Sequence, residues 1–455
     1  MAENMSAIGI LAEAAMSFDI QTVPKNVLSS AKRCLIDVCG VTIAGSKSDS
    51  ARLLRKTAAE TYGLGNCNIV GTSQRINPSG AAFVNATAAH ALDFDDNCYA
   101  GIVHGSAVVF PAVLAVAQEL GLDGSQLLLG FLTGLEVEFA LAKALTNSIY
   151  DKGWWTTSVL GAIGSTAGVA KVVGLNLEMT KNALSLAAVG TGATRALRGT
   201  SAKHFYSGRA AELGVFASNA AKQGVTGPIN VFEDRLGVPQ LLNDEIFHSN
   251  KLETLGTEYG LIDPGVDIKK YPVCYASHAA VDAVKEIVDV EGIHASDVAF
   301  VNCTVPPIVA SNLTYHMPKN ASEAQFSLHF AIASVLLYGS ISLQHLKDNV
   351  FLTEEVKSLI SKVKMTVGDV PKHVRSSHKI CPEWGYVEIV SKSGARNVAF
   401  VGSALGSASR PLSERALRSK FIECLQYGKF EGSSTRLYDK LRDVEFVNNT
   451  QELFC

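Results

Sequence analysis

The chain contains 455 residues, of which 47% are hydrophobic and 18% are charged. This length exceeds that of a single hydrophobic core, and the composition excludes a disordered chain, so we expect two folded domains. The 40 Lys and Arg residues and the 43 Asp and Glu residues give a net charge of −3, which provides no basic excess for binding a nucleic-acid backbone or an anionic membrane.

Roughly the first 260 residues are predicted to form successive α-helices, because apolar residues recur at helical spacing. Gly121, Gly174 and Gly224 each follow such a segment as candidate C-caps. Many of these helices have little polar surface, which indicates a central bundle or burial against a second subunit. The predicted helices are 27–39, 80–92, 106–120, 126–146, 158–173, 179–189 and 208–223.

The pattern changes after Pro264, where β-rich segments alternate with helical ones. Ser393 and Gly394 lie between the last two β-rich segments and predict a hairpin turn. We therefore expect a mainly α protein, with a large all-helical domain formed by both chain ends (1–265 and 406–455) and a smaller inserted α+β lid domain (266–405). The predicted strands are 298–305, 362–367, 386–391 and 397–401, and the predicted helices among them are 278–289, 323–338 and 353–362.

The nine cysteines show no CxxC spacing, which favours reduced thiols in the cytoplasm over a disulfide framework or a zinc site. No signal peptide is expected, and charged residues such as Glu136 and Glu138 interrupt the apolar stretches, so no run is predicted to span a membrane. GxGxxG, Walker, HExxH and GxSxG motifs are missing from the sequence, so nucleotide-driven, zinc-dependent and serine-hydrolase chemistry are not our first hypotheses.

Three carboxylates within four residues, Asp93, Asp95 and Asp96, form the first polar cluster, and His104 follows them. Because like charges repel, these carboxylates require cations, hydrogen bonds or water. The structural alternative is that they cap helices and form a solvated turn, and Asp95 and Asp96 are the expected structural pair.

Two further clusters contain cations. Lys203 lies in residues 199–209, just before an apolar helix, and a lysine at a helix N-terminus is unfavourable unless an anion such as a substrate carboxylate lies nearby. The alternative is a solvent-facing lysine. The third cluster, residues 269–278, ends at His278 and lies at the predicted domain boundary, where small-molecule sites are common. A purely structural histidine is the alternative there.

Together the three clusters resemble the MmgE/PrpD family, whose members include 2-methylcitrate dehydratase, cis-aconitate decarboxylase and iminodisuccinate epimerase. The resemblance covers nearly the whole chain, because the matching strings occur in the order and spacing of the family. These strings are 91–96 with His104, 153–161, Gly199-Thr200 with Lys203 and Gly208, 224–228, and Lys270-Tyr271-Pro272 with Cys274 and His278.

The resemblance implies a large helical domain with an inserted lid, a homodimer, and no metal or organic cofactor. The pocket residues of the family correspond here to Asp93, His104, Lys203 and His278, and Tyr315 is an addition from the lid. Lys270 in the third cluster is a further candidate for binding substrate.

This sequence departs from the family pattern at four positions. Asn97 stands where the family usually has threonine, and Gly105 where it usually has proline. Trp155 replaces a second pocket histidine, and Tyr206 stands where many relatives have histidine. Because an indole transfers no protons at neutral pH and can only stack or donate one hydrogen bond, we expect Asn97, Trp155 and Tyr206 to contact a different substrate or to accompany a shifted mechanism.

Decarboxylation, dehydration and epimerisation all develop negative charge on a carbon beside a carboxylate or imine. We expect Lys203 to bind a substrate carboxylate, His104 and His278 to transfer protons, and Asp93 to orient one of these histidines. A Schiff-base role for Lys203 is the alternative.

Three functional classes follow from this chemistry. The first is a lyase, either a decarboxylase or a dehydratase, that acts on a small di- or tricarboxylate related to aconitate or methylcitrate. The second is an epimerase or isomerase of a dicarboxylate resembling iminodisuccinate. The third is a polycarboxylate-binding protein without catalytic activity.

Overall fold

The computed structural model describes residues 5–372, 374 and 380–454, and the chain forms two compact units. The first, which we call the helical unit, comprises the residues up to Ala91, 95–266 and 415–455. The second, the mixed unit, comprises 92–94 and 267–414. The sequence predicts boundaries after residues 265 and 405, whereas the structure has them after Val266 and Glu414 and also assigns the short segment 92–94 to the mixed unit.

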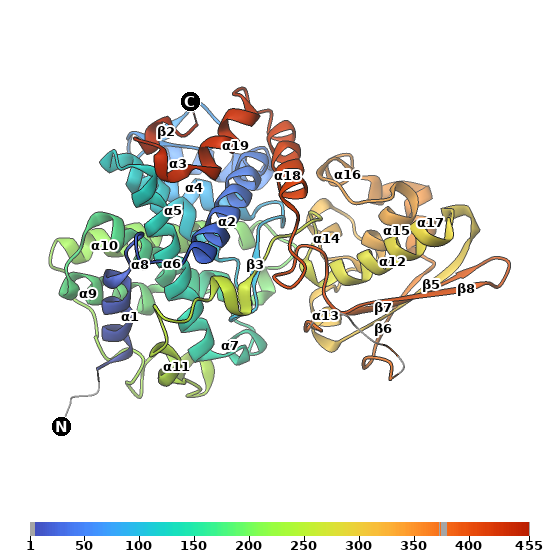
Figure 1. Ribbon diagram of the computed structural model, residues 1–455, viewed down its shortest axis with the longest axis horizontal. Coiled ribbons are helices and arrows are strands. Elements are labelled where there is room, and N and C mark those ends of the chain that lie inside the picture. The colour runs from blue at the N-terminus through green and yellow to red at the C-terminus, as the bar shows by residue number, and fades with distance from the viewer. Residues whose placement is uncertain (1–4, 373, 375–379, 455) are drawn as a thin grey trace. The chain divides into compact units, whose positions relative to one another are not determined.

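The helical unit is built almost entirely from α-helices (Figure 1). Its few strands are short: β1 (Cys67–Asn68) pairs antiparallel with β2 (Arg75–Ile76), and β3 (Asn97–Cys98) lies in the connection between two helices. The helices are α1 (Ala7–Ser17), α2 (Lys25–Gly45), α3 (Asp49–Thr61), α4 (Pro78–His90), α5 (Gly105–Leu120), α6 (Gly124–Leu145), α7 (Ser148–Asp151), α8 (Thr156–Val173), α9 (Leu177–Gly190), α10 (Ala202–Lys222), α11 (Val238–Asn243), α18 (Glu414–Tyr427) and α19 (Ser434–Arg442).

Helix α8 lies at the centre of this unit, where it packs against α5, α6, α9 and α10. Glycines bring its backbone close to that of α6. A Cβ atom on Gly164 would lie 2.9 Å from the carbonyl oxygen of Gly134, and a Cβ atom on Gly168 would lie 2.7 Å from that of Gly130. Side chains at these positions would push the two helices apart, so the glycines fix the depth at which the N-terminus of α8 is buried.

A second glycine contact joins α10 to α4. A Cβ atom on Gly208 would lie 2.7 Å from the carbonyl oxygen of Phe83 and 2.6 Å from Oγ1 of Thr87. His90 lies about one turn beyond Thr87, and Lys203 lies between one and two turns before Gly208. The close packing of these two helices therefore brings two polar residues toward the same region of the core.

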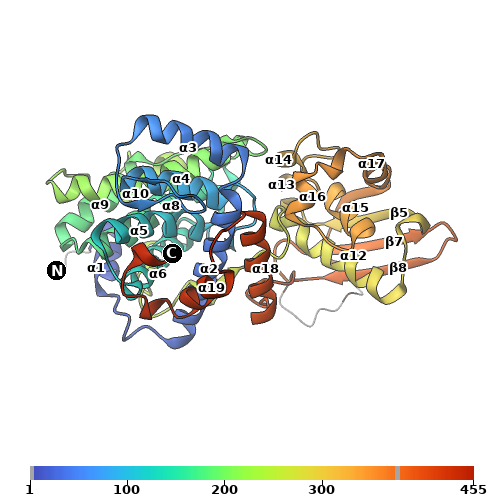
Figure 2. The same cartoon turned by 90° about the horizontal axis from the view of Figure 1, so that it is seen from above.

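The mixed unit contains a four-stranded sheet with the order β6-β5-β7-β8. Figure 2 shows β5, β7 and β8 of this sheet. The central strands β5 and β7 run antiparallel, β7 and β8 form the predicted hairpin, and β6 runs parallel to β5. Helices α12 and α15 pack against the sheet, which buries apolar residues of β5 and β7. The strands are β5 (Val298–Val305), β6 (Val363–Val367), β7 (Gly385–Ser391) and β8 (Arg396–Val401), and the helices are α12 (His278–Glu291), α13 (Pro307–Asn312), α14 (Ala321–Ala324), α15 (Leu328–Tyr338), α16 (Leu343–Lys347) and α17 (Glu354–Ile360).

The mainly α architecture agrees with the sequence prediction, but one predicted helix was wrong. Residues 323–338 form two helices, α14 and α15, because the chain turns between them and Ser327 caps the second one by accepting a hydrogen bond from the backbone N–H of Phe330. The predicted C-caps Gly121 and Gly174 adopt the expected left-handed conformation, with φ of 65° and 71°.

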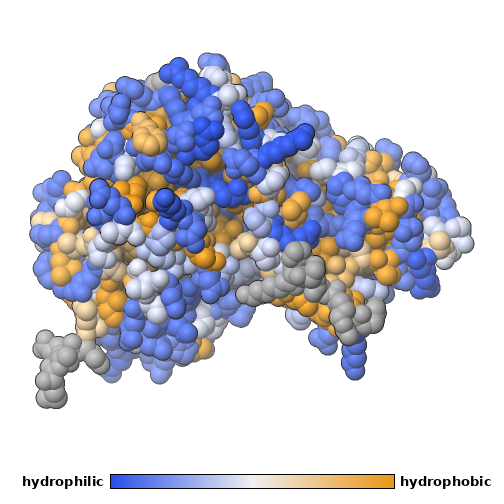
Figure 3. Space-filling model, viewed as in Figure 1, coloured by the Kyte–Doolittle hydropathy of each residue, from blue (hydrophilic) through white to orange (hydrophobic). Residues whose placement is uncertain are grey.

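Within the described part of the chain, the length and composition of the 18-residue helix α8 alone would allow it to cross a membrane. The sequence prediction that no apolar run is long enough to do so was therefore wrong. Helix α8 is 83% buried inside the helical unit, as expected for a core helix. The viewed face of the molecule is largely hydrophilic, with apolar patches between polar side chains (Figure 3).

Candidate active site

The densest group of buried polar residues in the helical unit lies where α4 gives way to α5. His90 is the last residue of α4, Asp95 and Asp96 lie in the connecting segment, and His104 immediately precedes the first residue of α5. The side chains of His90 and Asp95 are fully buried, whereas the side chain of His104 retains 10% exposure. Of these three side chains, His104 is thus the one that reaches the surface of the helical unit.

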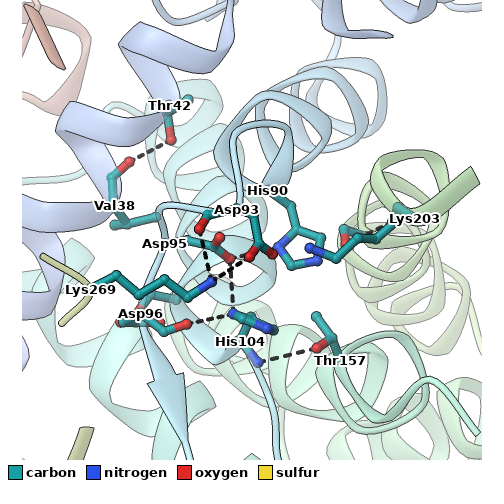
Figure 4. Close-up of polar contacts among 12 residues, drawn as sticks. Val38, Thr42, His90, Asp93, Asp95, Asp96, His104, Thr157, Lys203 and Lys269 are labelled. Atoms are coloured by element: carbon teal, nitrogen blue, oxygen red, sulfur yellow. Dashed lines mark hydrogen bonds and ion pairs between the residues drawn. The ribbon is translucent and has the colours of Figure 1, made fainter. Parts of the chain in front are cut away.

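Hydrogen bonds join these residues into a chain (Figure 4). The Nδ1 atom of His90 lies 2.7 Å from Oδ2 of Asp95, and the same carboxylate oxygen lies 3.4 Å from Nδ1 of His104. The Nδ1 atom of His104 also lies 2.7 Å from the backbone carbonyl oxygen of Asp96, and its backbone N–H donates to Oγ1 of Thr157 at 3.2 Å. A carbonyl oxygen can only accept, so Nδ1 of His104 bears a proton and Nε2 is the nitrogen left for chemistry.

Burial determines the charges in this chain. The pKa of His90 is lowered to about 3. Burial is the main cause, the charge of Asp95 opposes it, and the positive charge of Lys203 adds to it. His90 is therefore neutral at neutral pH and donates its Nδ1 proton to Asp95. Burial acts to raise the pKa of Asp95, but the contacts with His90 and His104 outweigh it and hold this pKa well below its usual range. Asp95 is therefore the anionic member.

Two further carboxyl groups, those of Asp96 and Glu138, are buried near this hydrogen-bond chain. Burial is the main cause that raises the pKa of Asp96 to about 7; the hydrogen bond that Ser106 donates to Oδ2 of Asp96 opposes the shift, and the charges of Asp37 and Asp95 add to it. Burial, together with the charge of Asp96, also raises the pKa of the fully buried Glu138 well above its usual value. Burial thus favours the protonated, uncharged form of both carboxyl groups.

Glu138 also explains one departure from the family pattern. A Cβ atom on Gly105 would lie 3.0 Å from Oε2 of Glu138 and 2.8 Å from Leu135. The proline that the family usually has at this position would not fit against these two side chains as they are placed here. Glycine at 105 therefore accompanies the buried glutamate of α6.

Lys203 and Trp155 complete this group, which we call the helical-unit cluster: His90, Asp95, His104, Trp155 and Lys203. Lys203 lies in the first turn of α10 and is only 1% exposed, so the solvent-facing alternative is wrong. Its Nζ atom lies 5.4 Å from the centroid of the Trp155 indole, and Figure 4 shows its side chain directed toward His90. The indole is stacked on His104 with ring centroids 6.1 Å apart, and it lies 5.8 Å from the ring of His90.

The backbone around Trp155 is held by a second loop. The backbone N–H of Trp155 donates to the carbonyl oxygen of Ala193 at 2.9 Å, and that of Arg195 donates to Gly153 at 2.7 Å. The guanidinium of Arg195 lies over the ring of Tyr150, 3.8 Å from its centroid. The loop that follows α9 therefore fixes the position of the indole before α10 begins.

The described residues contain one group with the spacing of metal ligands, formed by His90, Asp95 and His104, whose candidate ligand atoms lie within 4.8 Å of one another. The two Nδ1 atoms in this group face acceptor oxygens at 2.7 Å, which requires that both carry protons. The Nδ1 atoms therefore cannot bind a metal ion in this arrangement, whereas the Nε2 atoms can. We interpret the three residues as a hydrogen-bond chain.

The mixed unit contains its own buried polar pair. Nζ of Lys269 lies 3.1 Å from Oδ2 of Asp93 and donates to the carbonyl oxygen of Asp93 at 2.9 Å, and both residues are almost completely buried. Asp93 adopts the left-handed conformation, with φ of 50°, which is costly for a residue other than glycine and is common at functional sites. Asp93 is thus held by a lysine, and its role in orienting a histidine stays a prediction.

His278 is the first residue of α12 and is fully buried in the mixed unit. Its Nε2 atom lies 3.2 Å from the carbonyl oxygen of Val273, and its ring packs between those of Tyr271 and Tyr275, with centroids 5.1 and 4.9 Å away. A Cβ atom on Gly385 would lie 2.7 Å from the backbone nitrogen of Ala280, so the glycine at the start of β7 admits the first turn of α12.

The remaining predicted residues occupy different environments. Asn97 is buried at the start of β3, and Tyr315 is partly buried in the mixed unit. Lys270 is partly exposed over the ring of Tyr271, so its neighbour Lys269 is the buried lysine of this cluster. Tyr206 is 40% exposed and lines a groove of about 430 Å³ together with Arg209 and Phe216, and its contact with substrate stays a prediction.

Sequence reasoning missed His90, Lys269 and the role of Asp95. His90 lies at the end of a predicted apolar helix, where it is easily taken for a core residue, and Asp95 was assigned to a structural pair. The available signal was spacing: His90 precedes Asp95 by five residues, and both precede a loop histidine. Lys269 and Lys270 are adjacent, and sequence alone does not distinguish which of them is buried.

Comparison with protein families covers most of the chain. A model of the MmgE/PrpD N-terminal domain matches residues 9–247, and a model of the MmgE/PrpD C-terminal domain matches residues 271–436. The first match contains the whole helical-unit cluster, and the second contains His278.

Individual relatives are similar at low identity. The cis-aconitate decarboxylase of Homo sapiens is 26% identical over 411 residues, which cover 87% of this chain and 82% of that protein. The enzyme of the same name from Mus musculus is 27% identical over 409 residues, with the same coverage. The 2-methylcitrate dehydratase of Escherichia coli O157:H7 is 24% identical over 376 residues, which cover 76% of this chain and 74% of that protein.

Proposed function

The chain belongs to the MmgE/PrpD family, and from this premise we propose that it is a cofactor-independent lyase that decarboxylates or dehydrates a small di- or tricarboxylate. Relatives with both activities, named cis-aconitate decarboxylase and 2-methylcitrate dehydratase, match three quarters or more of the chain. The similarity over most of the chain supports the class of reaction. At this low identity, the substrate has to be established by experiment.

One observation carries the proposal: a buried ammonium group and an orientated imidazole flank the same indole. Lys203 lies 5.4 Å from the centroid of the Trp155 ring, and His104 is stacked on that ring. A buried cation attracts a carboxylate, and an imidazole with a free Nε2 can deliver or remove a proton. A polycarboxylate offers both the anion and the acidic carbon on which such groups act.

Decarboxylation follows from these two groups. The bond between the substrate carbon and the departing carboxylate breaks, its electron pair stays on the carbon, and CO2 leaves. Lys203 stabilises the charge that spreads onto the remaining carboxylate. Nε2 of His104, after taking a proton from solvent, transfers it to the carbon. In a dehydration the same nitrogen would remove the carbon-bound proton, and the hydroxyl group would leave as water after protonation by a second acid.

Trp155 distinguishes this chain from the family pattern and supports a different substrate. The indole is larger and less polar than the histidine it replaces, and it lies against both His104 and Lys203. We propose that it favours a flatter acid than cis-aconitate, or one with an apolar arm that stacks on the indole.

Residues of the mixed unit belong to the same proposal by resemblance. We assign His278 as the second proton-transfer group, Asp93 as a catalytic residue held by Lys269, and Lys270 and Tyr315 as candidates for substrate contact; Asn97 and Tyr206 of the helical unit are further candidates. Substitution of each of them by a residue of similar size that lacks its polar group, followed by steady-state kinetics, tests these roles one at a time. The proposal also includes a homodimer and a cytoplasmic location.

The test is mass-spectrometric analysis of products from a panel of small polycarboxylates that includes cis-aconitate, 2-methylcitrate and iminodisuccinate, with and without a chelator. Loss of CO2 or water from one acid, unaffected by the chelator, is the expected result. Inversion of a stereocentre without loss of mass would instead identify an epimerase. Binding without turnover would identify a non-catalytic member, and activity lost to the chelator and restored by one divalent ion would contradict cofactor independence.

A further inference from the structure

The hydrogen-bond chain in the helical unit has a direction. His90 is neutral and donates to Oδ2 of Asp95 through Nδ1, and the same oxygen lies 3.4 Å from Nδ1 of His104. Its three side chains run from a fully buried imidazole through a fully buried carboxylate to an imidazole with 10% exposure. Such an order resembles a catalytic unit in which each member orients the next.

We infer that Asp95 and His90 are positioning residues that hold the proton of His104 on Nδ1 and so leave Nε2 as the reacting nitrogen. This inference rests on the proposed function, in which His104 transfers the proton. It concerns two residues that the family resemblance did not assign to the pocket.

Two acceptors fix the proton on Nδ1. The carbonyl oxygen of Asp96, at 2.7 Å, can only accept, and the carboxylate of Asp95 adds negative charge on the same side of the ring. When Nε2 takes up a proton, the resulting imidazolium lies next to this anion, which favours the charged intermediate of a proton transfer.

His90 holds Asp95 in place. A buried carboxylate with one partner would be free to turn toward another cation, such as Lys203, whose side chain is directed toward the His90 ring (Figure 4). The proton that His90 donates at 2.7 Å orients Oδ2, and the two imidazole rings lie 4.7 Å apart. The other titratable groups near this hydrogen-bond chain are Asp96, Glu138 and Lys203.

The closing experiment combines kinetics with 15N NMR of the full-length protein labelled at histidine, in which the His104 signals are assigned by their loss in His104→Gln. In the unmodified protein we expect the Nδ1–H tautomer. Asp95→Asn removes the negative charge beside Nδ1 but leaves the carbonyl acceptor of Asp96, so we expect the Nε2–H tautomer to gain population without replacing the Nδ1–H tautomer, and kcat to fall by about 10- to 100-fold, with KM changed by less than about threefold.

Conservative variants separate positioning from general stability. His90→Asn keeps a donor at the position of Nδ1 and is expected to retain more activity than His90→Phe, which removes it. His329→Asn is the matched control, because His329 is also buried but lies on α15 of the mixed unit; it should leave the His104 spectrum unchanged. Combining His90→Phe with Asp95→Asn should add little further loss, since the residues act as a unit.

Two results would overturn the inference: an Nε2–H tautomer of His104 in the unmodified protein, or Asp95→Asn with kcat within twofold of the unmodified value. If Asp95→Asn fails to fold, the unmodified spectrum and the two His90 variants decide. If no acid is turned over, the proposed function fails, but the tautomer of His104 and its response to Asp95→Asn still test the positioning.

Discussion

The ammonium group of Lys203 lies 5.4 Å from the centroid of the Trp155 indole, and Lys203 is only 1% exposed. The indole thus stands between a buried cation and the imidazole of His104, on which it is stacked. By the resemblance, Trp155 stands where the family has a histidine, and an indole transfers no protons at neutral pH.

Replacing Trp155 should change which acid the enzyme prefers. Trp155→His restores the family residue and is expected to raise kcat/KM for cis-aconitate or 2-methylcitrate at least about tenfold, because it adds a polar, proton-bearing group beside Lys203. Steady-state kinetics with both acids measure this. An unchanged ratio between the native substrate and these acids would remove Trp155 from the site.

The control for Trp155 separates binding from stability. Trp155→Ala is expected to weaken binding of the native substrate and to lower the melting temperature by several degrees, because it leaves a cavity. Trp384→Ala removes an equally buried tryptophan from the mixed unit, so it should lower the melting temperature without altering the preference between acids.

Lys203→Met should remove the anion-binding charge while preserving the length of the side chain. We expect kcat/KM to fall by about 10- to 100-fold, which corresponds to the roughly 1.5–3 kcal/mol of a hydrogen bond to a charged group. Lys222→Met, at the exposed end of the same helix, is the control and should leave kinetics unchanged. Equal kinetics for the two variants would contradict the role of Lys203.

Glu138 should make the helical unit less stable as the pH rises. Its pKa is raised above the ordinary value of 4.5, so its contribution to stability is fully present below that value and is lost as the pH rises toward the raised pKa. Glu138→Gln should therefore weaken the fall in unfolding free energy between about pH 5 and 7, by about 1.4 kcal/mol per pH unit.

Urea unfolding at several pH values measures this slope. The exposed Glu60→Gln is the matched control and should reproduce the slope of the unmodified protein. If Glu138→Gln gave that same slope, Glu138 would have to be ionised in the folded protein, in conflict with its complete burial.

The protein is expected to be a homodimer through its helical unit. The long helices have little polar surface, and large apolar side chains remain exposed on α9 and α10, with Val189 55% and Phe216 65% exposed. Light scattering at micromolar concentration should give about twice the chain mass of 48.3 kDa. A measured mass equal to that of a single chain at micromolar concentration would contradict the prediction.

Periodicity along the chain predicted much of the fold, because helix and strand contacts repeat within a few residues. It predicted α5, α8 and the β7–β8 hairpin, and it joined α14 to α15, which are separated by only Gln325, Phe326 and the capping residue Ser327. The helical-unit cluster depended on packing instead. His90 meets Asp95 and His104 because the segment after α4 turns back. Lys203 comes toward them because Gly208 lets α10 approach α4, and neither event has a periodic signal.

The choice of carboxylate illustrates the same limit. Asp93, Asp95 and Asp96 are nearly adjacent, and composition gives them equal weight. In the structure Asp93 pairs with Lys269, and Asp95 contacts two histidines. The pKa of Asp96 is raised to about 7, mainly by burial. Three neighbouring residues of similar chemistry thus have three different roles, which only their tertiary partners determine.

The most direct test of proton transfer is turnover in D2O with the acid that the product screen identifies, followed by mass spectrometry of the product. For a decarboxylation, the account predicts one solvent deuterium on the carbon that loses CO2, formed in amounts equal to CO2, at a rate that falls sharply in His104→Gln. For a dehydration, it predicts deuterium in recovered substrate only where proton removal is reversible, with the same dependence on His104. A deuterated product formed at an unchanged rate in His104→Gln, or binding of every acid without loss of CO2 or water, would contradict it.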